Sequence, residues 1–391
     1  FQGNGHSIKG LKMNNTNNSR CRYAGLFCNL VNATVENLVI DLSCSFTGES
    51  VGALSVSVGG SLMVKNTTNN ADVNGQERVG GFIGYIPSLK QQTVISFEYC
   101  VNNGNITGGW LVGGFVGSMS GNSNMTLTIS NSTNNGNPTG GRDVGGFVGY
   151  FSSNSYMTVI ISNCTNNGLS IVSGRAVGGF VGRITGNTNM TVFISNSTNC
   201  GSISGNIYVG GLVGYLISNT DTTVTISNCI NNGNPTGSEN CIGGFVGSIE
   251  SSTDMAMIIS NSINNGNVVG SGKYVGGFVG YINYYLNTDL IMLDITNSAN
   301  KGSVSAKQGM ACGFVCVCSE YSTYAKITTN NSINKGSVNA STYGYGIANS
   351  ITVARNVVSM GDVTGSSGSY TFWDASTDVD LFFGLDGKCI N

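Results

Sequence analysis

Charged residues are scarce in this chain, at 9% of 391 residues, whereas typical soluble proteins contain roughly 25%. The formal net charge is −2, so no strong field exists to attract nucleic acid or an anionic membrane. No apolar run reaches the length of about 18 residues that indicates a transmembrane helix. Only 3 prolines accompany 58 glycines, which argues against a collagen-like or proline-rich disordered chain. We therefore expect no nucleic-acid partner, and contact with a membrane only through segments outside this chain.

Groups suited to catalysis or metal binding are also few. His6 is the only histidine, so a histidine-based triad would depend on one side chain near the start. The densest acidic group lacks the spacing of an EF-hand loop, and we interpret it as a solvated cap in preference to a calcium or catalytic site. It comprises Asp374, Asp378, Asp380 and Asp386. We expect a non-enzyme without metal or other cofactor. The absence of an initial Met and of a signal peptide indicates a mature or excised piece, with any export signal or anchor outside it.

The phrase VGGFVG, or a close variant, recurs along the chain in steps of mostly 32 or 33 residues. Its central aromatic or aliphatic position falls at Phe82, Phe115, Phe147, Phe180, Leu212, Phe245, Phe278 and Phe314, and at Ile347 in a degenerate copy. A fixed period of this length is typical of solenoids and propellers. The unit is rich in Gly, Asn, Ser, Thr and Val and lacks helix formers at helical spacing, which argues against helical repeats.

The stretch MTLTISNS (125–132) alternates between apolar and polar positions, as a half-buried strand does. VGGFVG predicts a second strand, and a weaker third piece precedes the next copy. We therefore predict an all-β fold, a parallel β-helix (solenoid) of about ten coils of about 33 residues, with equivalent positions stacked about 4.8 Å apart. Scarce charge fits this fold, because like charges stacked in one column would repel. A propeller is the rival, but its blades need four strands in about 40 or more residues.

The phrase ISNSTNNGN (129–137) contains two recurring asparagine columns. The first asparagine shares its strand parity with Ile129, so it is predicted to point inward and to form a stacked hydrogen-bonded ladder. The predicted ladder comprises Asn66, Asn131, Asn163, Asn196, Asn228, Asn261, Asn297 and Asn331. The second asparagine, as in Asn134, is followed by Asn or Lys and then Gly. These residue types tolerate positive φ and predict a sharp corner.

Several patterns concern the outer surface. Asn124 and Asn189 stand in loop sequons and are the better candidates for N-glycosylation, whereas the inward asparagine column should stay unmodified. Outward Thr and Ser residues form a stripe that Phe193 and other residues interrupt, which disfavours ice binding and suggests a contact face for another chain. The position after the second Val-Gly alternates large and small, and its tyrosines are candidate surface contacts, with plain outer-face packing as the alternative. They are Tyr85, Tyr150, Tyr215 and Tyr281.

The 12 cysteines do not have an evident bridge pattern. One column, on the outward parity, holds a cysteine in alternate coils, about 9.6 Å apart and too far for a disulfide. Its members are Cys100, Cys164 and Cys229. Cys312 and Cys316 occupy columns that hold glycine in other copies and are predicted to be small packing residues, in a geometry poor for zinc. A disulfide in the N-terminal segment and one to a late coil both stay open; the cysteines concerned are Cys21, Cys28, Cys44 and Cys389.

The repeated unit VGGFVG…ISNSTNNGNPTG resembles the GLUG repeat of bacterial and protist surface proteins and large adhesins. FQGNGHSIKGL and AGLFCNLVNATVENLVI are similar to the usual lead-in of such arrays, and YTFWDASTD (370–378) is similar to their closing segment. The resemblance implies a right-handed parallel β-helix on a cell surface that acts as a stalk, filament or adhesin, without shared catalytic residues. Asn-Asn-Gly stands where many members have a Tyr-Ala-Thr-Gly-like phrase, so no specific partner follows.

We divide the chain into N-terminal lead-in coils or cap (1–50), a repeat array (51–365) and a C-terminal capping segment (366–391). The expected function is that of a non-catalytic structural or adhesive protein, extracellular or on a cell surface. The alternative is a carbohydrate-binding or polysaccharide-cleaving β-helix. Expected partners are the protein itself, as a polymer or lateral assembly, or glycans and proteins of a host or cell surface.

Overall fold

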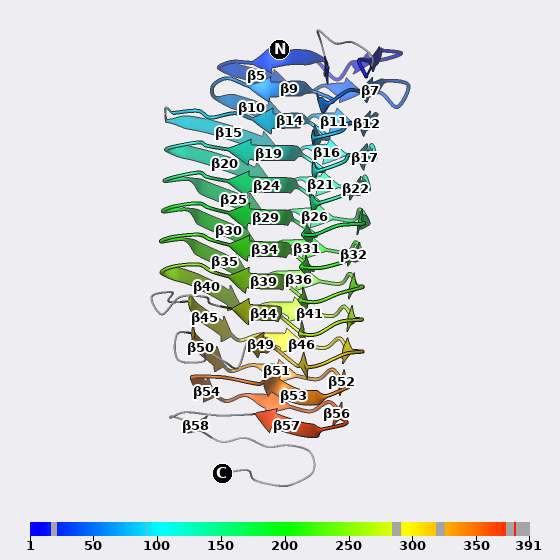
Figure 1. The fold of residues 1–391 in the computed structure, drawn as a ribbon. Coiled ribbons are helices and arrows are strands. Elements are labelled where there is room, and N and C mark those ends of the chain that lie inside the picture. The colour runs from blue at the N-terminus through cyan, green and yellow to red at the C-terminus, as the bar shows by residue number, and fades with distance from the viewer. Residues whose placement is uncertain (17–21, 91, 284–290, 318–324, 373–378, 381–391) are drawn as a thin grey trace.

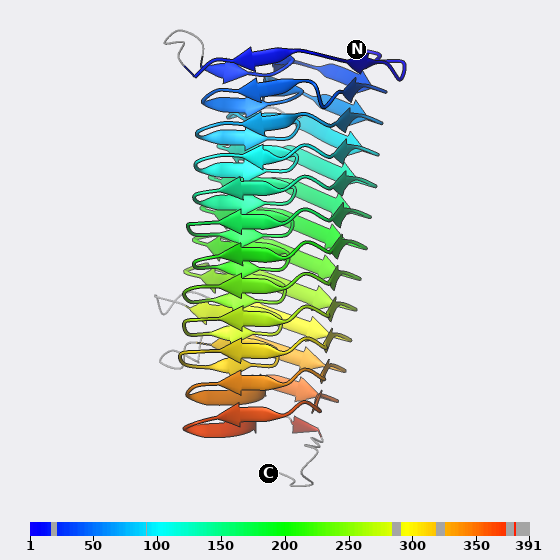
Figure 2. The same ribbon diagram turned by 90° about the vertical axis from the view of Figure 1, so that its right-hand side faces the viewer.

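The computed structural model is an elongated stack of β-coils, with the N-terminus at one end and the last described strand, β58 (Val379–Asp380), at the other (Figure 1, Figure 2). It describes residues 1–391 except 17–21, 91, 284–290, 318–324, 373–378 and 381–391. The described residues form strands, bends and turns without an α-helix. Accordingly, no helix in the described ranges is long and apolar enough to cross a membrane.

Each coil contributes to four parallel sheets, which we name A to D. In one central coil the chain runs through β18 (Leu111–Gly113), β19 (Val116–Ser120), β20 (Met125–Ser130), β21 (Thr133–Asn134) and β22 (Pro138–Gly140). β18 and β19 lie in sheet D, β20 in sheet A, β21 in sheet B and β22 in sheet C. Each strand pairs in parallel with its equivalents in the coils before and after, so identical sequence positions form columns along the stack.

Sheet A contains β5 Ala33–Glu36, β10 Leu62–Lys65, β15 Thr93–Glu98, β20, β25 Thr158–Ser162, β30 Thr191–Ser195, β35 Thr223–Ser227, β40 Met255–Ser260, β45 Ile291–Thr296, β50 Ala325–Asn330, β54 Val353–Arg355 and β58. Sheet B contains β1 Ser7–Ile8, β6 Val39–Ile40, β11 Thr68–Asn69, β16 Val101–Asn102, β21, β26 Thr165–Asn166, β31 Thr198–Asn199, β36 Ile230–Asn231, β41 Ile263–Asn264, β46 Ala299–Asn300, β51 Ile333–Asn334 and β55 Val358–Ser359.

Sheet C contains β2 Lys12–Asn14, β7 Ser45–Thr47, β12 Asp72–Asn74, β17 Ile106–Thr107, β22, β27 Ser170–Val172, β32 Ile203–Gly205, β37 Pro235–Gly237, β42 Val268–Gly270, β47 Val304–Ala306, β52 Val338–Ala340 and β56 Val363–Gly365. Sheet D contains β3 Tyr23–Ala24, β4 Phe27–Leu30, β8 Ser50–Gly52, β9 Ser55–Val58, β13 Arg78–Gly80, β14 Ile83–Ile86, β18, β19, β23 Asp143–Gly145, β24 Val148–Ser152, β28 Val177–Gly178, β29 Val181–Thr185, β33 Val209–Gly210, β34 Val213–Ile217, β38 Ile242–Gly243, β39 Val246–Glu250, β43 Val275–Gly276, β44 Val279–Asn283, β48 Ala311–Cys312, β49 Val315–Val317, β53 Tyr343–Ala348 and β57 Gly368–Phe372.

The predicted parallel β-solenoid with coils of about 33 residues is confirmed. Sheets A, B and C each contain twelve strands within the described ranges. The lead-in residues already join these sheets, since Ser7 of β1 pairs with Val39 of β6. Near the other end one coil is shortened, because Asn334 is followed in its column by Ser359, only 25 residues later.

The core is a column of apolar side chains that runs the length of the stack. In sheet A, the inward positions of β20 are Met125, Leu127 and Ile129, all at most 1% exposed, as the alternation predicts. The phenylalanines of the VGGFVG phrase stack in the same interior, with ring centroids 4.8 Å apart between Phe115 and Phe147. Burial of each such side chain contributes roughly 1.5–3 kcal/mol.

Glycine allows the backbones of sheet D strands to approach closely, both within one coil and between adjacent coils. A Cβ atom at Gly113 would lie 2.0 Å from the carbonyl oxygen of Val116, and one at Gly117 would lie 2.5 Å from the carbonyl oxygen of Gly84. Neither distance can accommodate a methyl group. The glycines of the VGGFVG phrase are therefore required for this close packing.

The buried asparagine ladder runs through the second asparagine column, which corrects the sequence-based prediction. In each link the side-chain Nδ2 donates to the Oδ1 of the next coil at 2.8 Å. The members are Asn69, Asn102, Asn134, Asn166, Asn199, Asn231, Asn264, Asn300 and Asn334, all 0% exposed. Each Nδ2 also donates to the carbonyl oxygen two residues later, as Asn134 does to Gly136 at 2.9 Å.

The predicted ladder residues lie instead at a left-handed corner. Asn66, Asn131, Asn163, Asn196, Asn228, Asn261, Asn297 and Asn331 have φ between 46° and 54°. All of them are exposed except Asn131, which is half-buried. The left-handed residue ends the sheet A strand and interrupts its alternation, so the next residue, Ser132 in this coil, points inward instead. Asparagine suits this corner because it tolerates positive φ better than most residues.

The same corner places the cysteine column inside, contrary to the predicted outward parity. Cys100, Cys164 and Cys229 are at most 1% exposed and free, and each alternates with a buried serine one coil later. The backbone N–H of Cys100 donates to Ser132 Oγ at 3.0 Å. Burial raises the pKa of the Cys100 thiol to about 12, so this thiol stays protonated and packs as a small apolar group.

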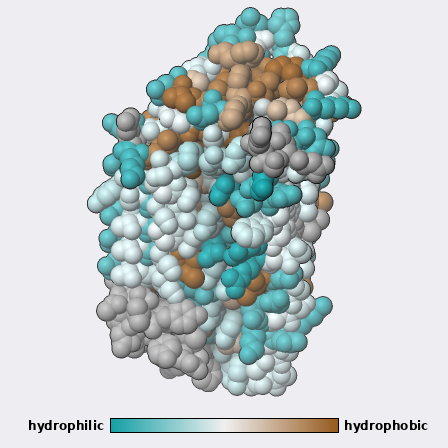
Figure 3. Space-filling view, turned by 45° about the horizontal axis from the view of Figure 1, so that its top comes forward, coloured by the Kyte–Doolittle hydropathy of each residue, from teal (hydrophilic) through white to brown (hydrophobic). Residues whose placement is uncertain are grey.

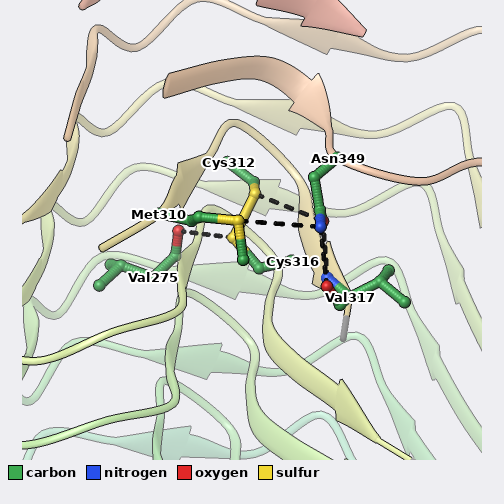
Figure 4. Close-up of a disulfide and its surroundings, with 6 residues drawn as sticks. All are labelled: Val275, Met310, Cys312, Cys316, Val317 and Asn349. Atoms are coloured by element: carbon green, nitrogen blue, oxygen red, sulfur yellow. Dashed lines mark hydrogen bonds between the residues drawn. A yellow bond between two sulfur atoms is a disulfide. The ribbon is translucent and has the colours of Figure 1, made fainter. Parts of the chain in front are cut away.

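Cys312 and Cys316 form a disulfide, which replaces the prediction that they act as small packing residues (Figure 4). Their Cα atoms are 5.6 Å apart, and the bond joins β48 to β49. Asn349, which is 4% exposed, lies beside the bond and exchanges hydrogen bonds of 2.7 Å with the N–H and carbonyl oxygen of Val317. Cys28 and Cys44 are free, while Cys21 and Cys389 lie outside the described residues.

Candidate functional site

Two columns of sheet D face each other where the chain folds back at the Gly-Gly pair, and we call this zone the seam. The first column precedes the first Val-Gly of each coil and comprises Arg78, Leu111, Asp143, Ala176, Tyr208, Cys241 and Tyr274. The second column is the alternating one identified in the sequence, namely Tyr85, Ser118, Tyr150, Arg183, Tyr215, Ser248 and Tyr281. Residues seven apart meet across the seam: the Tyr208 and Tyr215 rings stack at 3.8 Å.

Arg183 is the cation at the centre of the seam. Its guanidinium carbon lies 5.9 Å from the Tyr150 ring centroid and 5.4 Å from that of Tyr215, within the range of cation–π attraction. Its Nη1 lies 3.9 Å from Oδ2 of Asp143, which is only 2% exposed. Burial raises the pKa of Asp143 to about 6, and Arg183 opposes this rise. The Oδ1 of Asp143 and the Nε of Arg183 are buried without a hydrogen-bond partner, so the ion pair leaves part of its hydrogen-bonding capacity unused.

Glu250 is the second carboxylate of this zone and is 5% exposed. Tyr215 Oη donates to its Oε2 at 3.0 Å, and Ser248 Oγ donates to its Oε1 at 2.8 Å. Burial raises the pKa of Glu250, while the hydrogen bonds from Ser248, Tyr215 and Tyr208 oppose this rise. Burial also raises the pKa of Tyr208 to about 12. The cluster is thus a closed, hydrogen-bonded network between coils.

The four predicted surface tyrosines therefore differ in exposure. Tyr85, Tyr150 and Tyr281 are half-buried, whereas Tyr215 is 5% exposed and faces the network, so its prediction as a surface contact is wrong. The cause is the fold-back at Gly-Gly, which covers the outer side of β34 with Tyr208 of the preceding segment. The period of the repeat carries no signal for this contact, although the paired tyrosines seven residues apart at 208/215 and 274/281 could have indicated it.

The outward side chains of sheet A are uncharged from β20 to β40. Hydroxyl side chains form two columns there: Thr126, Thr158, Thr191 and Thr223, and Ser130, Ser162, Ser195, Ser227 and Ser260. Between and beside them are exposed apolar residues, among them Val94, Phe193, Ile258 and Met292. The predicted outward Thr/Ser stripe with apolar interruptions is thus in place.

The loops that precede β20, β25, β30 and β35 contain a second buried ladder that the sequence reasoning missed. Nδ2 of Asn122 donates to Oδ1 of Asn154, and the same bond of 3.0 Å links Asn154 to Asn187 and Asn187 to Asn219. The sequence does mark this ladder, because asparagine is the second residue of each of the repeated phrases GNSNMT, SNSYMT and GNTNMT. This ladder fixes the loops that carry Asn124 and Asn189, both of which are exposed as predicted.

The end of the stack that carries the N-terminus exposes apolar side chains, seen as the brown area in Figure 3. Phe1, Tyr23, Val31 and Leu42 are 41–77% exposed there. The Phe1 ring contacts the Phe27 ring edge-to-face at 5.8 Å. The remaining coloured surface in this view is pale or teal, with a few smaller brown spots.

The other candidate residues do not assemble into a site within the described ranges. His6 is exposed near the first strand. The side chains of Asp374, Asp378, Asp380 and Asp386 lie outside the described part of the chain. Among the described residues, no group of three or more His, Cys, Asp or Glu side chains could hold a metal ion.

Comparisons with known proteins do not identify a relative: no protein-family model matches the chain, and no curated protein sequence matches it.

Proposed function

We propose that this chain is a rigid, non-catalytic rod of a cell surface or extracellular filament, built from GLUG-like repeats. The observation that carries the proposal is the uninterrupted pairing of sheets A and B from the first coils to the last. Two internal asparagine ladders lock the corners of successive coils. A frame in which every coil repeats the same bonds suits a spacer or display scaffold, because each coil contacts only its neighbours and each added coil adds another stabilising interface.

Two further features support an extracellular, non-catalytic role. The Cys312–Cys316 disulfide is typical of proteins from oxidising compartments. The two carboxylates of the seam, Asp143 and Glu250, are at most 5% exposed. They already contact Arg183 and the hydroxyls of Tyr215 and Ser248, respectively. A polysaccharide-cleaving enzyme needs carboxylates that reach the glycosidic bond.

The proposal is tested on cells of the source organism with antibodies raised against residues 1–391. We expect labelling of intact, unpermeabilised cells or of shed filaments. Labelling that appears only after permeabilisation would overturn the surface location. In parallel, the purified chain is incubated with plant, fungal and bacterial polysaccharides, and new reducing ends and unsaturated products are measured. Product formation that persists after repurification would overturn the non-catalytic role.

A further inference from the structure

An open groove of about 460 Å³ crosses three coils at the edge of the sheet A outer face. Its exposed walls are formed by Gln92, Val94, Asn124 and Tyr156, and Thr126 and Thr158 lie along it. Its volume lies in the range of about 300–1,000 Å³ in which proteins bind small ligands. The groove is therefore large enough for a ligand.

Tyr156 is the unusual residue of this groove. It has φ of +50°, in a loop column whose other members are Asn124, Asn189, Asp221 and Asp254, all with φ between 47° and 54°. Asparagine and aspartate tolerate this conformation, whereas a bulky tyrosine is disfavoured in it. Burial does not compensate for the cost, since Tyr156 is 62% exposed. Strain of this kind gathers at functional sites, and Tyr156 is the strained tyrosine that lines the groove, which makes it the candidate for a ligand contact.

The chemistry of the lining narrows the class of ligand. None of the lining side chains named above is an acid or a base at neutral pH: they offer two amides, two threonine hydroxyls, one phenol and the apolar Val94. An anionic ligand would find no cation there. A peptide could not add as a strand either, because β20 is already paired on both sides, with β15 and β25.

We infer that this groove binds a neutral oligosaccharide, with the Tyr156 ring against the apolar C–H face of one sugar. The amides of Gln92 and Asn124 and the hydroxyls of Thr126 and Thr158 are the donors and acceptors for its hydroxyl groups. The open shape implies weak binding per site, which many rods on one surface would strengthen through multivalency. This inference rests on the proposed location of the rod at a surface and names a class of partner for it.

The chain provides a matched control for the test. Tyr99 is also an exposed tyrosine, at 52%, with φ of +52°, in a column that holds asparagine in the neighbouring coils. It does not line the groove. Tyr156→Asn and Tyr99→Asn therefore make the same chemical change, and both restore the residue type that the conformation favours. Both variants should fold at least as well as the unmodified chain, which thermal melts by circular dichroism would verify.

The experiment uses residues 1–391 produced in a bacterial host, so that no N-glycan on Asn124 occupies the groove. An array of neutral and sialylated oligosaccharides is probed first, and the best neutral ligand is titrated by calorimetry. We expect binding of neutral glycans that Tyr156→Asn weakens at least tenfold and Tyr99→Asn changes less than twofold.

Three results would overturn the inference: no binding to any neutral glycan at millimolar concentration, equal affinity in Tyr156→Asn, or selective binding of sialylated glycans. None of these results would alter the antibody labelling of intact cells, so the failure of this inference and the failure of the proposed surface location can be told apart.

Discussion

Asn134 and Asn166 lie one above the other at the corner between sheets B and C, although they are 32 residues apart in sequence. Nδ2 of Asn134 donates to Oδ1 of Asn166 at 2.8 Å, and Nδ2 of Asn166 repeats the bond to Asn199. Each amide thus gives and receives one bond along the axis, and none is exposed to water. A buried polar group that is fully paired in this way fixes the register of successive coils, because any slip would leave amides unpaired.

Substitution Asn166→Ala tests the ladder. It would leave Nδ2 of Asn134, Oδ1 of Asn199 and the carbonyl oxygen of Gly168 without one partner each in a dry interior. We expect the free energy of unfolding to fall by at least about 3 kcal/mol, because three buried groups each lose a partner. The control is Asn167→Ala, because the Asn167 side chain is exposed and donates to Oδ1 of Asn135; here the loss should stay below about 1 kcal/mol. Urea unfolding measures both, and equal losses would contradict the ladder's role.

The repeat period was sufficient to predict the sheets, since equivalent positions have the same residue types in coil after coil. The prediction that Asn131 points inward was wrong because it assumed that the inward and outward alternation of the strand continues through this residue. A left-handed residue, with φ of +50° here, stops the alternation without changing the sequence pattern. Asn131 and Asn134 are the same residue type, and only the corner geometry decides that the first is half-exposed and the second buried.

The close packing of the sheet D strands can be tested at the columns that hold glycine in most coils and Cys312 and Cys316 in a later one. Gly113→Ala places a Cβ atom 2.0 Å from the Val116 carbonyl oxygen, and we expect a loss of about 3 kcal/mol or more. The double variant Cys312→Gly/Cys316→Gly restores the residue type that β43 and β44 have at Gly276 and Gly280. It should fold and lose only the contribution of a short disulfide loop, about 2 kcal/mol.

Non-reducing peptide mapping of the unmodified chain should find Cys312 and Cys316 joined. Two free thiols there, or a double glycine variant that fails to fold while Gly113→Ala folds normally, would contradict the packing of the two strands. The register between β44 and β49 shifts by one residue next to this site.

Asp143 makes the stability of the fold depend on pH. Burial raises its pKa from 3.8 to about 6, so the folded chain binds this proton more tightly than the unfolded chain does. The stabilising effect of protonation is complete below about pH 4 and is lost as the pH rises through about 6, a difference of about 3 kcal/mol for a shift of two pKa units. Asp143→Asn should flatten the unfolding free energy over this window. Arg183→Met should steepen the profile, because it removes the charge that opposes the shift.

Unfolding free energies from urea titrations at pH 4, 5, 6 and 7 would check this sign. Stability that rises with pH across the window in the unmodified chain, and equally in Asp143→Asn, would exclude the proposed contribution.

The candidate site was less accessible to sequence reasoning than the fold. Tyr215 and Tyr208 meet because sheet D folds back at a glycine pair, and a repeat period does not report on contacts inside one coil. Glu250 occurs in a column where the neighbouring coils have Ile217 and Asn283, so no recurring residue marked it. Features that recur were predictable in this chain, whereas the single exceptions that make up the candidate sites depended on geometry.

Substitutions of Glu250 test whether this residue serves the seam as a hydrogen-bond acceptor or through its charge. Glu250→Ala would leave the hydroxyls of Tyr215 and Ser248 without their acceptor in a buried zone, and we expect a loss of about 2–3 kcal/mol. Glu250→Gln retains one oxygen acceptor and removes a buried charge, so its loss should stay below about 1 kcal/mol. Glu239→Ala, at an exposed position, serves as the control and should be nearly neutral. Urea unfolding ranks the three variants; a Gln variant as unstable as the Ala variant would mean that the network requires the carboxylate charge itself, because the two variants differ chiefly in the oxygen that Gln keeps.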